Sequence, residues 1–208
     1  VEEVDQASVV LINSCGFIRP AVEEAIDTIL ELGACKENNP HQLLVVTGCM
    51  VQRYGNELVA ELPEVDLFVG LDDFPRINQL IESIAPEQRV ITTPGAATYL
   101  MDSSVPRRMT TPFFRSYLKI TEGCDNRCAY CMIPSIRGRL RSRPPADLIT
   151  EAIHLEQSGV KELSLIAQDL TAYGRDFDMG APVTLVTLLE SLLANTVIPW
   201  LRLLYAYP

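Results

Sequence analysis

Short apolar runs alternate with amphipathic stretches along the first half of the chain. The apolar runs have the length and composition of buried strands and cover residues 9–12, 43–46, 67–69 and 90–91. The stretches between them carry apolar residues at helical spacing, after Pro20, over 56–62 and over 77–84. This alternation predicts an α/β domain over residues 1–93, in which helices cover a parallel sheet.

The alternation breaks over residues 94–115 and then resumes. Prolines and a glycine punctuate this segment without a clear period, so it is predicted to be a linker between domains. Beyond it, strands are predicted at 117–120, 163–166 and 200–205, helices at 145–158 and 184–195, and a long loop at 121–144. This order is typical of the first part of a β/α barrel, which we expect over residues 116–208.

The composition favours a folded, acidic protein. Apolar residues make up 48% of the chain, and 17 basic against 27 acidic residues give a net charge of −10, which disfavours a general nucleic-acid binder. The absence of a basic leader or a long apolar run predicts a cytoplasmic protein without a membrane partner. Because the chain begins with Val1 and ends on a strand-like run, we expect it to be a fragment. In the cytoplasm, its six cysteines favour metal binding or catalysis over disulfides.

Three closely spaced cysteines carry the strongest chemical signal. Cys124, Cys128 and Cys131 lie in the long loop that follows the predicted strand at 117–120. Thiolates are soft ligands that suit iron–sulfur clusters and zinc. Three of them can ligate three irons of a cubane and leave the fourth iron open, whereas a structural zinc would need a fourth protein ligand. A non-catalytic zinc-binding α/β protein is the alternative of another class.

Two cysteines of the first domain each follow a predicted strand directly. Cys15 comes after the run at 9–12 and Cys49 after the run at 43–46. Parallel strands end at one edge of a sheet, where ligands bind in open α/β folds, so the two thiols could share a second metal site. Alternatively, each is a small buried apolar residue. Cys35 follows no predicted strand and receives no role.

Polar residues also gather near the cysteine loop. Arg137, Arg139, Arg141 and Arg143 follow it; they could bind a carboxylate, contact a nucleic-acid backbone or remain solvated. Gln168 and Asp169 end the predicted strand at 163–166. Polar groups at that position face the active site of a barrel, although such a pair can also simply begin a loop.

The cysteine spacing, with Tyr130 before the last cysteine, resembles the radical S-adenosylmethionine superfamily. The resemblance implies a 4Fe–4S cluster whose open iron binds S-adenosylmethionine and cleaves it to a 5′-deoxyadenosyl radical, which takes a hydrogen from the substrate. It further implies no catalytic side chain beyond the cluster ligands. The residues expected to bind the cofactor are Tyr130, Arg143, Gln168 and Asp169.

The runs at 13–18 and 47–54 resemble the amino-terminal domain of the methylthiotransferases. In that family three cysteines of this domain bind an auxiliary 4Fe–4S cluster, and Cys15 and Cys49 match two of them. The third would lie upstream of Val1. The resemblance implies a flavodoxin-like parallel-sheet domain followed by a partial TIM-type barrel that contains the radical S-adenosylmethionine core.

Segments 117–124, 132–138 and 167–174 look like the RimO branch of this family. That branch adds a methylthio group to the β-carbon of an aspartate in small-subunit ribosomal protein S-twelve. One S-adenosylmethionine would supply the methyl group and a second the radical, with electrons from a donor such as flavodoxin or ferredoxin. The alternative is the branch that modifies N6-isopentenyladenosine in transfer RNA, in which case a nucleic acid would be a partner.

Overall fold

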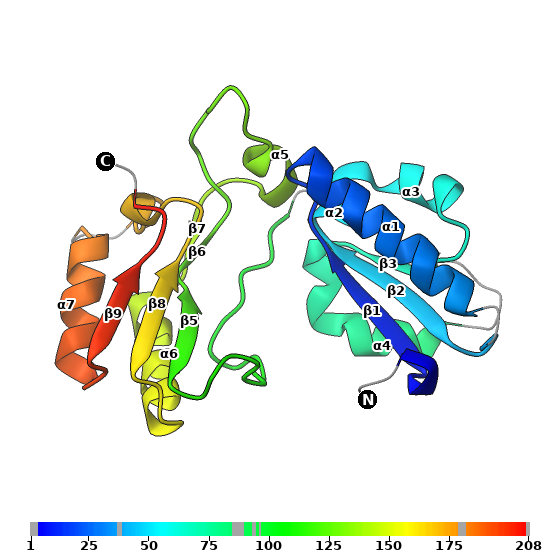
Figure 1. Cartoon of the computed structure of the whole chain (residues 1–208). Helices are drawn as coiled ribbons and strands as arrows, with labels where there is room; N and C mark the ends of the chain where they lie inside the picture. Colours follow the sequence, from blue (N-terminus) through cyan, green and yellow to red (C-terminus); the bar gives the residue numbers. More distant parts are fainter. Residues whose placement is uncertain are drawn as a thin grey trace. The chain divides into compact units, whose positions relative to one another are not determined.

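The structure of the chain is a computed structural model, in which two compact units are distinguished. It describes residues 4–36, 39–84, 90–92, 95, 97–178 and 182–206. The first unit comprises Val1–Tyr99 and Cys128–Arg137, and the second comprises Leu100–Arg127 and Gly138–Pro208. Figure 1 labels helices and strands of both units.

The first unit is built on a parallel sheet, as predicted. Its strands β1 (Val9–Ser14), β2 (Leu43–Gly48), β3 (Leu67–Val69) and β4 (Val90–Ile91) pair in chain order. The helices are α1 (Arg19–Lys36), α2 (Cys49–Tyr54), α3 (Asn56–Glu61) and α4 (Ile77–Ser83), with 3-10 turns η1 (Val4–Gln6) and η2 (Leu71–Arg76). Among the described strands, the order does not show the reversal typical of flavodoxin-like sheets.

The central strand β2 is covered on both faces. Leu44 and Val46 pack in one buried cluster with Ile29 of α1, whereas Val45 between them packs with Ile77 of α4 and its neighbours. Successive side chains of a strand point to opposite faces, so an uninterrupted apolar run is what a strand between two helical layers requires. Not every apolar residue of α1 packs in this core, because Leu30 is 45% exposed.

The second unit contains the expected start of a β/α barrel. Strands β5 (Arg115–Lys119), β8 (Glu162–Ile166) and β9 (Trp200–Leu203) form a parallel sheet, and β6 (Thr121–Glu122) pairs antiparallel with β7 (Arg141–Ser142). The crossovers are α6 (Pro145–Gln157) and α7 (Leu185–Asn195), with η3 (Leu170–Ala172) after β8. A short helix, α5 (Ile133–Arg137), lies in the cysteine loop and belongs to the first unit.

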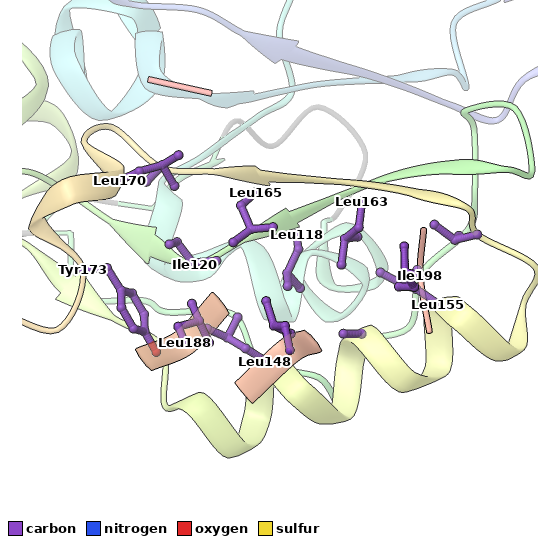
Figure 2. Packing of buried hydrophobic residues seen from close by; sticks show 14 residues of the cluster. Leu118, Ile120, Leu148, Leu155, Leu163, Leu165, Leu170, Tyr173, Leu188 and Ile198 are labelled. Carbon is purple, nitrogen blue, oxygen red and sulfur yellow. The ribbon is translucent and has the colours of Figure 1, made fainter. Parts of the chain in front are cut away.

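The core of the second unit lies between this sheet and its two helices. Figure 2 shows Leu118 of β5 and Leu163 of β8 directed toward helix α6, which carries Leu148, with Leu188 of α7 near Leu148. These four side chains are almost completely buried. The predicted helix at 184–195 therefore packs against the sheet as α7, and helix-capping hydrogen bonds between Thr184 and Thr187 begin it.

The predicted linker is partly held against the second unit. The Ser103 amide donates to Asp147 Oδ1 at 2.8 Å, and Arg107 pairs with Glu151 at 2.7 Å, so the segment after residue 100 is tied to α6. Residues 93, 94 and 96 lie outside the described residues. The domain limits at 93 and 115 stay predictions. Over the part of the chain that is described, none of the helices combines the length and hydropathy needed to cross a bilayer.

Candidate functional site

The cysteine loop begins after β6 and ends before β7, and these two strands pair antiparallel in the second unit. Gly123, directly after β6, has a φ of +68°, and a Cβ placed there would lie 2.0 Å from the Arg139 carbonyl oxygen. Only glycine permits this close approach at a left-handed φ. The Cys124 amide then donates to the Gly138 carbonyl at 3.2 Å, so the two ends of the loop are joined next to the first cysteine.

Replacement of Gly123 by alanine is expected to disrupt the placement of Cys124. A left-handed φ alone costs alanine roughly 1–2 kcal/mol, and the Cβ would also collide with the backbone of Arg139. Iron bound per chain after anaerobic reconstitution should fall several-fold, as measured by colorimetric iron analysis. Gly95→Ala is the matched control because a Cβ there meets no atom within 4 Å. Equal iron content in the two variants would show that the turn at Gly123 is dispensable.

Asp125 joins the same two ends of the loop. Its carboxylate accepts hydrogen bonds from the Leu140 amide at 3.0 Å and from the Arg139 guanidinium at 3.1 Å. The Arg139 hydrogen bond, followed by that of Leu140, holds the pKa of Asp125 below its ordinary value, so the group is a carboxylate at neutral pH. Arg141 donates to the Arg139 carbonyl. Two members of the predicted arginine cluster thus stabilise the loop itself.

The first cysteine is buried and its sulfur accepts a hydrogen bond. The Asn126 amide donates to Cys124 Sγ at 3.4 Å. Backbone N–H groups directed at a thiolate sulfur are a usual feature of iron–sulfur sites, where they tune the reduction potential. Asn126 in turn donates its side-chain amide to Asp169 Oδ2 at 2.9 Å.

The other two cysteines of the motif lie in the first unit. The Cys131 amide donates to the Cys128 carbonyl at 3.0 Å, which forms a tight turn before α5. Both thiols are partly exposed, and Tyr130 between them is 83% exposed. Ile133 and Ile136 bury one face of α5, which packs against α2.

The donor set of the loop fits an iron–sulfur cluster. Cys124, Cys128 and Cys131 are all free thiols, and three thiolates are the ligands such a cluster needs when one iron stays open. Within the described residues, no three cysteine, histidine or acidic side chains are gathered into a preformed metal-binding group. The metal role of these three residues stays a prediction that their chemistry supports.

Cys15 and Cys49 follow neighbouring strands at one edge of the first sheet. Ser14 and Gly48, the residues before them, are paired in the register of β1 and β2. Cys15 is exposed and Cys49 is buried. Two thiols hold too few ligands for a 4Fe–4S cluster, so the predicted auxiliary site is not complete within the described residues and stays a prediction. Cys35, which received no role, lies in α1 and is partly buried.

One contact at this edge was missed by the sequence analysis. Arg137, the last residue of α5, donates from Nη2 to Cys49 Sγ at 3.2 Å. The two residues are 88 positions apart, so no local pattern could have paired them. Arg137 was singled out only as part of a basic stretch, and the structure directs it to a predicted cluster ligand.

The predicted cofactor residues at the end of β8 differ in their surroundings. Gln168 is exposed and lines a cavity of about 390 Å³ at the carboxyl ends of the sheet strands, together with Lys119, Thr121 and Tyr205. This volume lies within the range of small-molecule sites. Asp169 is only 6% exposed, and its oxygens accept hydrogen bonds from Thr171 and Asn126. Contact of either residue with S-adenosylmethionine stays a prediction, which the geometry supports for Gln168 alone.

Arg143 is occupied within the fold rather than directed at a ligand. It is 1% exposed, pairs with Asp147 at 2.6 Å and Glu151 at 2.7 Å, and donates to the Lys119 carbonyl. Burial raises the pKa of Asp147, but hydrogen bonds from Ser103 and Arg143 outweigh it and hold the pKa below its ordinary value. The predicted contact with the cofactor stays a prediction, which the geometry does not favour because these internal acceptors already surround the guanidinium.

Comparison with known families matches both halves of the chain. Residues 1–70 match a family described as "Uncharacterized protein family UPF0004", and residues 118–186 match the "Radical SAM superfamily". The second match begins in β5 and includes the cysteine loop, Gln168 and Asp169.

Curated relatives match nearly the whole chain. The ribosomal protein uS12 methylthiotransferase RimO of Desulfotalea psychrophila is 53% identical over 204 residues, which cover 97% of this chain and 45% of the relative. The proteins of the same name from Citrifermentans bemidjiense and Myxococcus xanthus are each 48% identical, covering 98% and 100% of this chain and 45% and 42% of the relative. The chain thus spans about half the length of these relatives.

A solved structure shares the fold. The radical S-adenosylmethionine methyltransferase TsrM from Kitasatospora setae, determined with cobalamin and a 4Fe–4S cluster, matches with a TM-score of 0.50 at 16% identity, covering 78% of this chain and 38% of that chain. That likeness concerns the fold, whereas the curated relatives, 48% to 53% identical over nearly the whole chain, show that the chain belongs to the RimO family of radical S-adenosylmethionine proteins.

Proposed function

We propose that the protein containing this chain adds a methylthio group to the β-carbon of an aspartate in ribosomal protein S-twelve. The observation that carries the proposal is the loop of three free thiols, Cys124, Cys128 and Cys131, in a chain about half identical to proteins named uS12 methylthiotransferase. The reaction replaces a hydrogen on an unactivated carbon, which acid–base chemistry does not achieve. A radical route requires the kind of metal site that these thiols can supply.

The residues of the chain would divide the work as follows. Cys124, Cys128 and Cys131 would hold the 4Fe–4S cluster, and Cys15 and Cys49 would provide two ligands to the auxiliary cluster. When bound, the first cluster supplies an electron that cleaves S-adenosylmethionine, which provides a radical able to remove hydrogen. The cavity lined by Gln168 would receive S-adenosylmethionine, because it lies at the strand ends where β/α barrels place their ligands.

The proposal includes partners and a compartment. The substrate is ribosomal protein S-twelve, and a small redox protein such as flavodoxin or ferredoxin would provide electrons. Both are cytoplasmic in a bacterium, and reduced thiols are the state that cluster assembly needs. The names of the relatives favour the ribosomal protein over transfer RNA, the alternative substrate, and a radical enzyme over a zinc-binding protein.

A direct assay of the product tests the proposal. The protein expressed from its complete reading frame is reconstituted with iron and sulfide, then incubated with S-adenosylmethionine, dithionite and either S-twelve or transfer RNA. We expect mass spectrometry to find a methylthio group on one aspartate of S-twelve and no change in transfer RNA. Cys35→Ala is the control variant and should retain the activity. A methylthio group found only on the nucleoside would overturn the substrate assignment.

A further inference from the structure

The buried carboxylate of Asp169 connects the end of β8 to the cysteine loop. Its Oδ1 accepts hydrogen bonds from the Thr171 amide at 3.0 Å and from the Thr171 hydroxyl at 2.7 Å, which begin η3. Its Oδ2 accepts the side-chain amide of Asn126 at 2.9 Å. One carboxylate oxygen therefore binds the segment that follows β8, and the other binds the cysteine loop.

Asn126 donates two hydrogen bonds, one from its side chain and one from its backbone. Its side chain is held by Asp169, while its backbone N–H donates to Cys124 Sγ at 3.4 Å. Cys124, Asn126 and Asp169 all belong to the second unit, so this chain of contacts lies within one unit. A hydrogen bond of 3.4 Å to sulfur depends on the orientation of the peptide, and the side-chain anchor of the same residue limits how that peptide can turn.

We propose that Asp169 is a positioning residue that holds Asn126 so that its backbone N–H stays directed at the Cys124 sulfur. This inference rests on the proposed cluster at Cys124. An N–H donor stabilises negative charge on a ligating sulfur, and that charge grows when the cluster accepts an electron, so the contact raises the reduction potential. Asp169 thereby favours reduction of the cluster by the electron donor, without touching the cofactor.

The substitution Asp169→Asn separates this role from simple packing. An amide has one acceptor oxygen where the carboxylate has two, and Asp169 accepts from donors on both sides. One side must therefore face an N–H group instead of an oxygen. Thr171→Val is the matched control, because it removes only the hydroxyl donor to Oδ1 and leaves the contact with Asn126 in place.

The test is the reduction potential of the reconstituted 208-residue chain, followed by electron paramagnetic resonance during a redox titration. In Asp169→Asn we expect the equilibrium constant for cluster reduction to fall about tenfold, equivalent to about 59 mV for one electron. Asn126→Ala, which keeps the backbone N–H but removes the anchor, should shift it in the same direction. Thr171→Val should stay close to the original chain.

A double-variant cycle makes the result specific to the Asp169–Asn126 contact. If the two residues act through each other, Asp169→Asn combined with Asn126→Ala should shift the potential no further than either change alone. If Asp169→Asn fails to fold, the reduction potential of Asn126→Ala alone tests the proposal, because that variant keeps the hydrogen bonds between Asp169 and Thr171.

Two kinds of failure are distinguishable. If the original chain binds no 4Fe–4S cluster, the proposed function fails and the role of Asp169 fails with it. If the original chain binds the cluster and the folded Asp169 and Asn126 variants have its unchanged potential, the positioning role alone is overturned.

Discussion

Replacement of Cys128 by alanine is expected to abolish the cleavage of S-adenosylmethionine by the reconstituted protein. Loss of even an outer hydrogen-bond partner typically costs a metal site roughly 10–100-fold in affinity or activity, so loss of a ligand should lower 5′-deoxyadenosine formation by more than about 100-fold. Cys128 is partly exposed and lies in a turn, so its replacement by alanine should not disturb the packing of the hydrophobic core. Liquid chromatography of 5′-deoxyadenosine measures the effect.

The control for this experiment is another cysteine of the same chain. Cys35 is partly buried in α1 and has no proposed ligand role, so Cys35→Ala should form 5′-deoxyadenosine at close to the original rate. Circular dichroism of both variants should match that of the original chain. Undiminished 5′-deoxyadenosine formation in Cys128→Ala would remove the three-cysteine assignment.

Replacement of Arg143 by methionine is expected to destabilise the second unit by about 3–5 kcal/mol, the usual effect of removing one partner of a buried ion pair. The side chain is 1% exposed, and its loss would leave the carboxylates of Asp147 and Glu151 without their shared cation. The hydrogen bond to the Lys119 carbonyl would be lost as well. Urea unfolding followed by the fluorescence of Trp200, the one tryptophan of the sequence, measures the change in this unit.

Arg202→Met provides the comparison. Arg202 also pairs with a glutamate, Glu162, but its side chain is 55% exposed, and exposed ion pairs contribute about 0–1 kcal/mol. The free energy of unfolding should therefore change little in this variant. If both variants changed the free energy of unfolding equally, the ion pairs of Arg143 would not stabilise the fold more than an exposed pair does. The predicted contact of Arg143 with the cofactor would then gain support.

The strands and most helices could be predicted because their signals are local. The uninterrupted apolar run of β2 and the helical spacing of the leucines of α7 are both visible within a few neighbouring residues. The elements that sequence analysis missed are short. β6, α5 and β7 all lie within residues 121–144, which were predicted to be a loop, and α2 follows β2 without a break.

The sequence alone pointed to the thiols of the candidate site, but not to the hydrogen bonds around them. The spacing of Cys124, Cys128 and Cys131 is local, so the sequence alone is enough to predict a metal-binding loop. The partners of Arg143 and Asp169 depend on which elements pack together. Asp169 reaches Asn126 across 43 positions, and an acidic residue at a strand end has the same appearance in the sequence whether it faces a ligand or holds a loop.

The most direct measurement is a joint iron, sulfide and zinc analysis of the anaerobically reconstituted 208-residue chain, with electron paramagnetic resonance of its reduced form. We expect about four irons and four sulfides per chain and a 4Fe–4S spectrum that changes when S-adenosylmethionine is added, because one iron has no protein ligand. Stoichiometric zinc with no such spectrum, or a spectrum indifferent to S-adenosylmethionine, would contradict the account.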